Sequence, residues 1–220
     1  QAKFYNDLNS DKRKLLGTEQ LDWIESRIIN SSAVWTIFGQ QVLMAKLKFP
    51  DISKMLKSKE IPSFLKPYLK FLGLGIPSNL DAWDGYPAER DKLYKLMSNA
   101  KKGFVSLAGD THNSWVSELK DKSGSKVGIE LGTPSVTSPG ITDVLNLDEK
   151  KFVESIVKIN NELKWMDPSN RGFLSLNCME DKIIASFNYI KELEEINSDI
   201  SSSKSFVLHR EGLELEEIKA

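Results

Sequence analysis

The chain has 220 residues, of which 40% are hydrophobic and 28% are charged, a composition typical of a globular domain with a core of its own. The formal net charge is −1 and the lysines are spread among acidic residues, which indicates solvated surface charge and gives no sign of a surface for nucleic acid or an anionic membrane. No apolar run is long enough to span a bilayer. A single cysteine, Cys178, excludes an internal disulfide but does not decide the compartment. The chain opens on Gln1 and shows no signal peptide, so we expect that its N-terminus has been removed or that it is a piece of a longer chain.

Two helices are predicted in the first half of the chain. Thr18 can cap a helix that runs through Asn30, where apolar residues recur at helical spacing. Pro87 fits the first turn of a second helix, which we expect to end near Ala100. On this second helix the i, i+4 spacing predicts an ion pair between two residues, Asp91 and Lys95.

A third helix and a set of strands follow. Asp148 can cap a helix that runs through Asn160, with Leu147 and Phe152 placed to pack together across the cap. Short runs rich in β-branched and aromatic residues predict strands over 33–38, 104–108, 115–119, 126–131, 172–177, 182–190 and 205–209. The order of helices and strands predicts a layered α/β fold whose sheet edges must be covered or paired.

Two segments do not fit this pattern. Residues 45–82 contain an amphipathic stretch that proline and glycine interrupt, and they are either a lid or a packed excursion from the fold. Residues 197–204 are polar and rich in serine, which predicts a linker.

The clearest chemical feature is the run Gly-Asp-Thr-His-Asn-Ser-Trp over 109–115, directly after a predicted buried strand. In an extended segment Asp110 and His112 would point the same way and address one centre. Carboxylate and imidazole groups both bind hard or borderline cations, so a metal site is one interpretation. The triplet recurs by chance, and a hydrogen-bonded Asp–His pair at a strand end is the alternative. The other histidine, His209, is expected at the surface.

Neighbouring segments strengthen the metal interpretation. Together with 109–115, four segments occur in the order and approximate spacing of one known family: 16–23 (LGTEQLDW), 81–90 (DAWDGYPAER), 132–140 (GTPSVTSPG) and 171–176 (RGFLSL). The chain therefore resembles the C-terminal portion of the alkaline phosphatase D (PhoD-type) metallophosphoesterases. The resemblance covers most of the chain.

The resemblance implies a calcineurin-like metallophosphoesterase fold, a β-sandwich flanked by helices, of which this chain is the C-terminal half. It implies hydrolysis of phosphate monoesters, often of diesters too, at a multinuclear site of calcium and iron, and it implies export to the periplasm or the exterior. By this match Asp110 and His112 are metal ligands, and no catalytic nucleophile is assigned. Asn113 and Trp115 are candidates to shape the substrate pocket, although a turn residue and a core residue are the alternatives. For Trp83, Tyr86 and Arg90 we expect packing and a salt bridge.

The resemblance also marks what this chain lacks. The family takes its other metal ligands, including an early aspartate, an Asp-x-x-Tyr pair and an Asp-Asp-His segment, from an N-terminal half without counterpart here. Gln40 stands where the family usually has asparagine, and Asn161-Glu162 stands where Asn-Pro-His is common. We assign 1–196 to the family domain and 197–220 to a linker with a terminal strand or tail. Two hypotheses remain: part of a metal-dependent phosphoesterase, or a truncated, non-catalytic remnant with a structural or partner-binding role.

Overall fold

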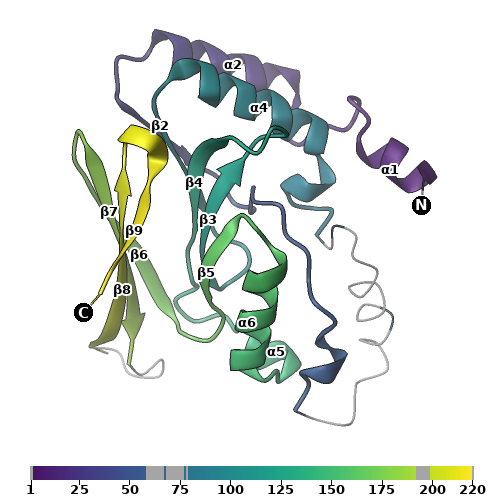
Figure 1. The fold of residues 1–220 in the computed structure, drawn as a ribbon, viewed down its shortest axis with the longest axis vertical. Coiled ribbons are helices and arrows are strands. Elements are labelled where there is room, and N and C mark those ends of the chain that lie inside the picture. Colours follow the sequence, from purple (N-terminus) through teal and green to yellow (C-terminus); the bar gives the residue numbers. More distant parts are fainter. Residues whose placement is uncertain (1, 58–66, 68–76, 78, 192–198, 220) are drawn as a thin grey trace.

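A computed structural model describes residues 2–57, 67, 77, 79–191 and 199–219. They form two β-sheets with helices, a mixed α/β fold (Figure 1). The helices are α1 (Ala2–Leu8), α2 (Gly17–Asn30), α4 (Pro87–Ala100), α5 (Ile141–Leu145) and α6 (Glu149–Ile159). The strands are β1 (Trp35–Gly39), β2 (Gly103–Ala108), β3 (Ser114–Lys120), β4 (Lys126–Gly132), β5 (Leu163–Asp167), β6 (Gly172–Cys178), β7 (Lys182–Ile190), β8 (Ile200–His209) and β9 (Leu215–Ile218).

The first sheet has five strands in the order β1-β2-β4-β3-β5. β1, β2 and β4 run parallel, whereas β3 is antiparallel to both of its neighbours. The predicted pair over 115–119 and 126–131 is confirmed as the β3–β4 hairpin. Its turn is closed by Asp121, whose carboxylate accepts the backbone N–H groups of Ser123 at 2.8 Å and Ser125 at 3.0 Å.

The second sheet is an antiparallel meander in the order β6-β7-β8-β9. It confirms the predicted hairpin over 172–177 and 182–190. The predicted linker over 197–204 is wrong from Ile200 onward, because these residues begin β8 and pair along β7. Strand propensity depends strongly on context, and serine keeps both backbone hydrogen-bonding groups, so a serine-rich run can form a strand when a partner lies beside it. The domain boundary that we placed between 196 and 197 lies outside the described residues.

The two sheets pack face to face. Their shared core combines four residues of the first sheet with six of the second: Val105, Val116, Ile129, Leu131, Ile183, Ala185, Phe187, Tyr189, Phe206 and Leu208. α2 and α4 cover the opposite face of the first sheet through a separate apolar cluster that includes Ile24, Leu93 and Phe104. In the part of the chain that the structure describes, no helix covers the outer face of the second sheet (Figure 1).

Two of the helix-start predictions are confirmed. Pro87 lies in the first turn of α4. Asp148 caps α6 by accepting the N–H of Lys151 at 3.2 Å, and Leu147 and Phe152 are buried in the same apolar cluster.

Two predictions from local spacing are wrong. Thr18 does not cap α2, which begins at Gly17; instead the carboxylate of Glu89 on α4 accepts the N–H groups of Leu15, Leu16 and Gly17 at 2.6, 2.9 and 3.2 Å. Asp91 does not pair with Lys95, because Lys122 on the β3–β4 turn lies 2.6 Å from its carboxylate. In both cases a partner distant in sequence displaces the local one.

Residues 44–48 form an irregular segment that is mostly buried yet lies outside both sheets. Each of its five backbone N–H groups donates to a side-chain oxygen from elsewhere: Met44 and Ala45 to Glu130, Lys46 to Glu162, Leu47 to Asp84 and Lys48 to Asn160, at 2.7–3.0 Å. A buried backbone N–H without an acceptor is costly, so these side chains do for the segment what a neighbouring strand does elsewhere. This part of the 45–82 stretch is packed into the fold, whereas 58–66 and 68–76, where a lid was considered, lie outside the described residues.

Candidate functional site

The loop between β2 and β3 carries the predicted metal ligands. Asp110 and His112 both have φ of 59°, the left-handed region, so the extended geometry that we expected for this run is wrong. A tight turn, not a strand, presents the two side chains. Both nevertheless line the same pocket of about 530 Å³, which lies between this loop, residues 43–49 and α5. The structure therefore brings the two predicted ligands to one cavity.

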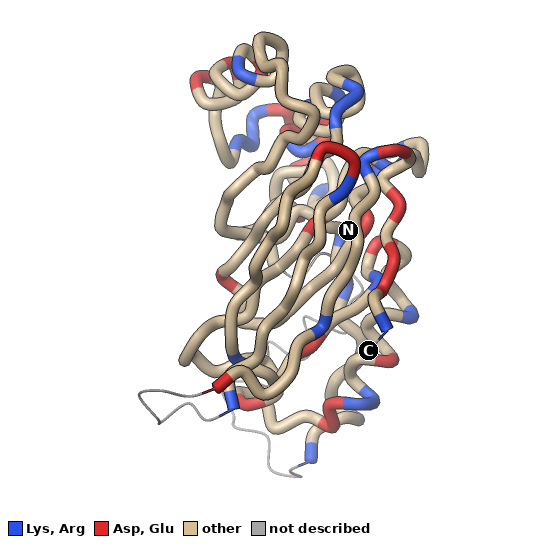
Figure 2. The backbone as a smooth tube through the Cα atoms, turned by 90° about the vertical axis from the view of Figure 1, so that its left-hand side faces the viewer, with Lys and Arg blue, Asp and Glu red and all other residues tan. Residues whose placement is uncertain are grey.

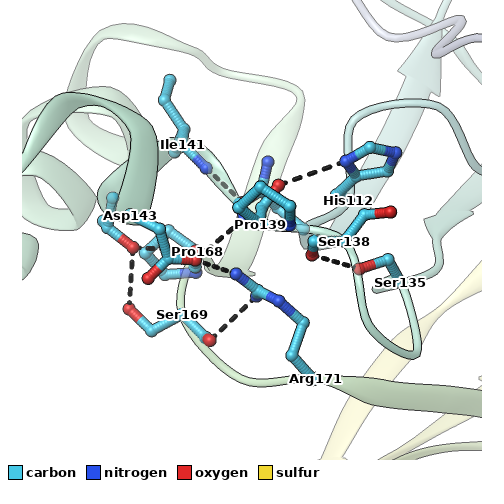
Figure 3. A network of polar contacts seen from close by, with 12 residues as sticks. His112, Ser135, Ser138, Pro139, Ile141, Asp143, Pro168, Ser169 and Arg171 are labelled. Carbon is cyan, nitrogen blue, oxygen red and sulfur yellow. Dashed lines mark hydrogen bonds and ion pairs between the residues drawn. The ribbon is translucent and has the colours of Figure 1, made fainter. Parts of the chain in front are cut away.

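His112 is held in a defined orientation. Its Nδ1 lies 3.1 Å from the carbonyl oxygen of Pro139 (Figure 3). A carbonyl oxygen only accepts hydrogen bonds, so Nδ1 carries the proton and the lone pair of neutral imidazole is on Nε2. A backbone carbonyl on one ring nitrogen is the usual second partner of a histidine that binds metal through the other.

A third acidic residue, Asp84, also lines the pocket but is already engaged. One of its carboxylate oxygens accepts the N–H of Leu47 at 3.0 Å, and the other lies 2.7 Å from the guanidinium of buried Arg90. This confirms the predicted salt bridge of Arg90, and Trp83 is fully buried as expected. Within the described ranges no three His, Cys, Asp or Glu side chains are grouped so that they could hold a metal ion.

Asn113 and Trp115 line the same pocket, and their polar atoms shape the loop. The side-chain amide of Asn113 donates to the carbonyl of Thr111, and its oxygen accepts the N–H of Ile141 at 3.1 Å. The indole N–H of Trp115 donates to the hydroxyl of Thr111 at 2.7 Å. Both side chains are buried, so they form the floor of the pocket and fix the turn that carries Asp110 and His112.

The two departures from the family pattern have structural roles. Gln40 accepts the indole N–H of Trp83 at 3.1 Å and donates to Ser106 at 3.2 Å. Glu162 binds Lys46 twice, through the backbone N–H at 3.0 Å and through Nζ at 3.1 Å. Neither side chain lines the Asp110 pocket. The carboxylate at 162 therefore stabilises the segment 44–48.

Residues Ala45 and Leu47 of the segment 44–48 line the pocket, and this segment is held by Glu130, which is fully buried. Its carboxylate accepts the N–H groups of Met44 and Ala45 and lies 3.2 Å from the hydroxyl of Ser106. Burial raises the pKa of Glu130 to about 7 despite these hydrogen bonds. Sequence reasoning missed Glu130 because nothing in its neighbourhood on β4 signals a buried acid.

None of the helices in the described ranges combines the length and the apolar character needed to cross a membrane.

His209, on β8, is part of the second sheet, and its side chain is 42% exposed, as expected for a surface residue.

Comparisons with known proteins identify relatives. A family described as PhoD-like phosphatase matches residues 1–187. Alkaline phosphatase D of Bacillus subtilis (strain 168) is 26% identical to this chain over 220 residues, which are 98% of this chain and 33% of that protein. A solved structure of PhoD is similar in fold, with a TM-score of 0.68 at 22% identity over 98% of this chain and 37% of the other. The chain thus spans about a third of the length of these relatives.

Proposed function

The chain belongs to the PhoD-like phosphatase family, and from this premise we propose that it is the C-terminal part of a calcineurin-like, metal-dependent phosphate-ester hydrolase. The observation that carries the proposal is the placement of Asp110 and His112 on one pocket, with Nδ1 of His112 3.1 Å from the carbonyl oxygen of Pro139. The fold similarity to PhoD over 98% of the chain supports the calcineurin-like assignment.

The donor atoms that this chain supplies can bind a metal ion, but they make up only part of a metal site. Asp110 supplies an exposed carboxylate and His112 an imidazole whose Nδ1 faces the carbonyl of Pro139, while Asp84 is occupied by Leu47 and Arg90. A carboxylate suits calcium, and imidazole suits iron, which agrees with the metals that the resemblance implies. The remaining ligands would then come from the part of the whole protein that this chain, about a third of its relatives' length, does not contain.

Metal ions held by Asp110, His112 and further ligands would neutralise the charge of a phosphate ester and lower the pKa of a bound water molecule. The residues of this chain contribute position. Asp110 and His112 hold metal, and neither is the nucleophile. Asn113 and Trp115 keep the turn rigid and form the pocket floor against which a phosphate monoester or diester binds.

The test uses the complete reading frame, assayed on p-nitrophenyl phosphate with calcium and iron. Asp110→Ala and His112→Ala are each expected to lower activity about 100-fold or more, because each removes a ligand. His209→Ala, on the second sheet, is the matched control and is expected to leave activity unchanged. Full activity in both site variants would reject the site, and no activity in the complete protein would favour the non-catalytic remnant.

Export is the remaining part of the proposal, and the family resemblance alone supports it. Fractionation of cells that express the complete reading frame tests this point. Recovery of the protein only in the cytoplasmic fraction would reject export.

A further inference from the structure

The carbonyl that orients His112 belongs to a short backbone run that is held on both sides. The N–H of Gly140 donates to the carboxylate of Asp143 at 2.9 Å, and the N–H of Ile141 donates to Asn113 at 3.1 Å. The carbonyl of Pro139 at the head of this run faces His112 (Figure 3). The position of that carbonyl therefore depends on what holds Asp143.

Asp143 is held by Arg171, which precedes β6. The two side chains form an ion pair in which Arg171 is 5% exposed and Asp143 is 50% exposed. Arg171 also donates to the carbonyl of Ser169 at 2.9 Å, so its guanidinium is fixed from two sides. A buried guanidinium with a planar set of donors is a rigid support, because its hydrogen bonds have fixed directions.

The space around Gly140 leaves no room for a side chain. A Cβ at Gly140 would lie 2.6 Å from the side-chain oxygen of Asn113 and 2.6 Å from the carbonyl oxygen of Pro168. Only glycine fits between these atoms. A series of contacts thus runs from Arg171 through Asp143 and Gly140 to Pro139. These contacts link the start of the second sheet to the loop between β2 and β3.

We propose that Asp143 and Arg171 are positioning residues that hold the Pro139 carbonyl against His112 and so direct Nε2 of His112 into the pocket. Neither residue lines the pocket itself. They act through the backbone of Pro139 and Gly140. The orientation of His112 rests on the contacts described here, whereas its use as a metal ligand rests on the proposed function.

The experiment measures the imidazole tautomer directly by ¹⁵N NMR of this chain without metal. The chain has two histidines, so the His209→Gln variant assigns both rings. At about pH 8, above the ordinary imidazole pKa of about 6.5, His112 is expected to be protonated on Nδ1 alone. Asp143→Asn is expected to give a mixture of tautomers. Glu217→Gln, which alters an ion pair with Lys204 in the second sheet, is the control and is expected to leave His112 unchanged.

A double variant, Asp143→Asn with Arg171→Met, removes both charges and avoids an unpaired buried guanidinium. It is expected to show the same mixture with far-UV circular dichroism unchanged, which separates positioning from loss of fold. An unaltered His112 tautomer in both variants, or an Nε2-protonated ring in the unmodified chain, would overturn the proposal.

A Mn²⁺ titration then measures metal binding at His112 separately from the tautomer. Paramagnetic broadening detects weak binding, and Asp143→Asn is expected to raise the apparent Kd at His112 about 10-fold, the usual effect of losing a supporting partner. An equal Kd in the variant and the unmodified chain contradicts positioning. Absence of broadening at both rings in the unmodified chain fits an incomplete metal site, whose use is tested by the activity of the complete reading frame. The tautomer measurement still decides the role of Asp143 and Arg171.

Discussion

Two regions of the molecule, the second sheet and the segment 44–48 beside the first sheet, satisfy their backbone polar groups in different ways. The second sheet does so by regular strand pairing, and the central lengths of β6 and β7 carry no charged residue (Figure 2). The first sheet is flanked by an irregular, mostly buried segment, 44–48, whose N–H groups are satisfied by distant side chains, among them the buried acids Glu130, Asp84 and Glu162.

The pocket lies on the irregular side. Leu43, Ala45 and Leu47 form one of its walls, and the loop with Asp110 and His112 forms another. A regular sheet leaves little backbone free to shape a cavity, whereas a segment held by individual side chains can follow the outline that a pocket needs. Polar residues inside the fold hold the backbone around the pocket, whereas apolar packing between the sheets stabilises the fold as a whole.

The largest expected effect tests the apolar core between the two sheets. Phe187 is fully buried between the sheets, with ring centroids 5.1 Å from Trp165 and 6.2 Å from Phe206. Phe187→Ala is expected to lower the free energy of unfolding by about 3 to 5 kcal/mol, measured by urea denaturation. Phe173→Ala, 44% exposed on the same sheet, is the control, with an expected change within about 0.5 kcal/mol. Equal losses in the two variants would contradict a core between the sheets.

The buried acid Glu130, which holds the segment 44–48, predicts that the stability of the fold depends on pH. Burial raises the pKa of Glu130 from 4.5 to about 7, so its contribution to stability is fully present below pH 4.5 and is lost as the pH rises through about 7. This amounts to about 3 kcal/mol. Glu130→Gln cannot ionise and is expected to lack this loss, which urea denaturation across the pH range measures. Parallel stability curves for the variant and the unmodified chain would show that Glu130 is not raised in pKa.

The smallest expected effect concerns Glu89 on α4, whose carboxylate binds the backbone at the start of α2. Glu89→Gln keeps one acceptor for the N–H groups of Leu15, Leu16 and Gly17 but removes the charge at the start of α2. A loss of about 1 to 2 kcal/mol is expected by thermal or urea unfolding. Glu25→Gln, on the exposed face of α2, serves as the control and should change stability by less than about 0.5 kcal/mol. If Glu25→Gln costs as much, capping by Glu89 is not the cause.

The sequence predicted elements wherever the cause was local. Pro87 and Asp148 mark the starts of α4 and α6, and both hairpins follow from alternating strands around a turn. It failed where the partner was distant. Thr18 is displaced as a cap by Glu89, and the serine-rich run from Ile200 becomes a strand because β7 lies beside it.

The site shows the same division. Family resemblance predicted a shared centre for Asp110 and His112, and both residues do line one pocket. The geometry assumed for them was wrong, because the run is a left-handed turn and not a strand. The link from His112 to Pro139 spans 27 residues and joins a side chain to a backbone carbonyl, so no residue type signals it.

The way the segment 44–48 is held has a consequence for redesign of the pocket. The fold recognises these five residues through their amide N–H groups, which every amino acid except proline supplies. Of the five, Ala45 and Leu47 line the cavity, so substitutions at these two positions change its outline while Glu130 and Asp84 keep their backbone N–H partners. Proline at any of the five positions would leave an anchoring oxygen without its N–H donor.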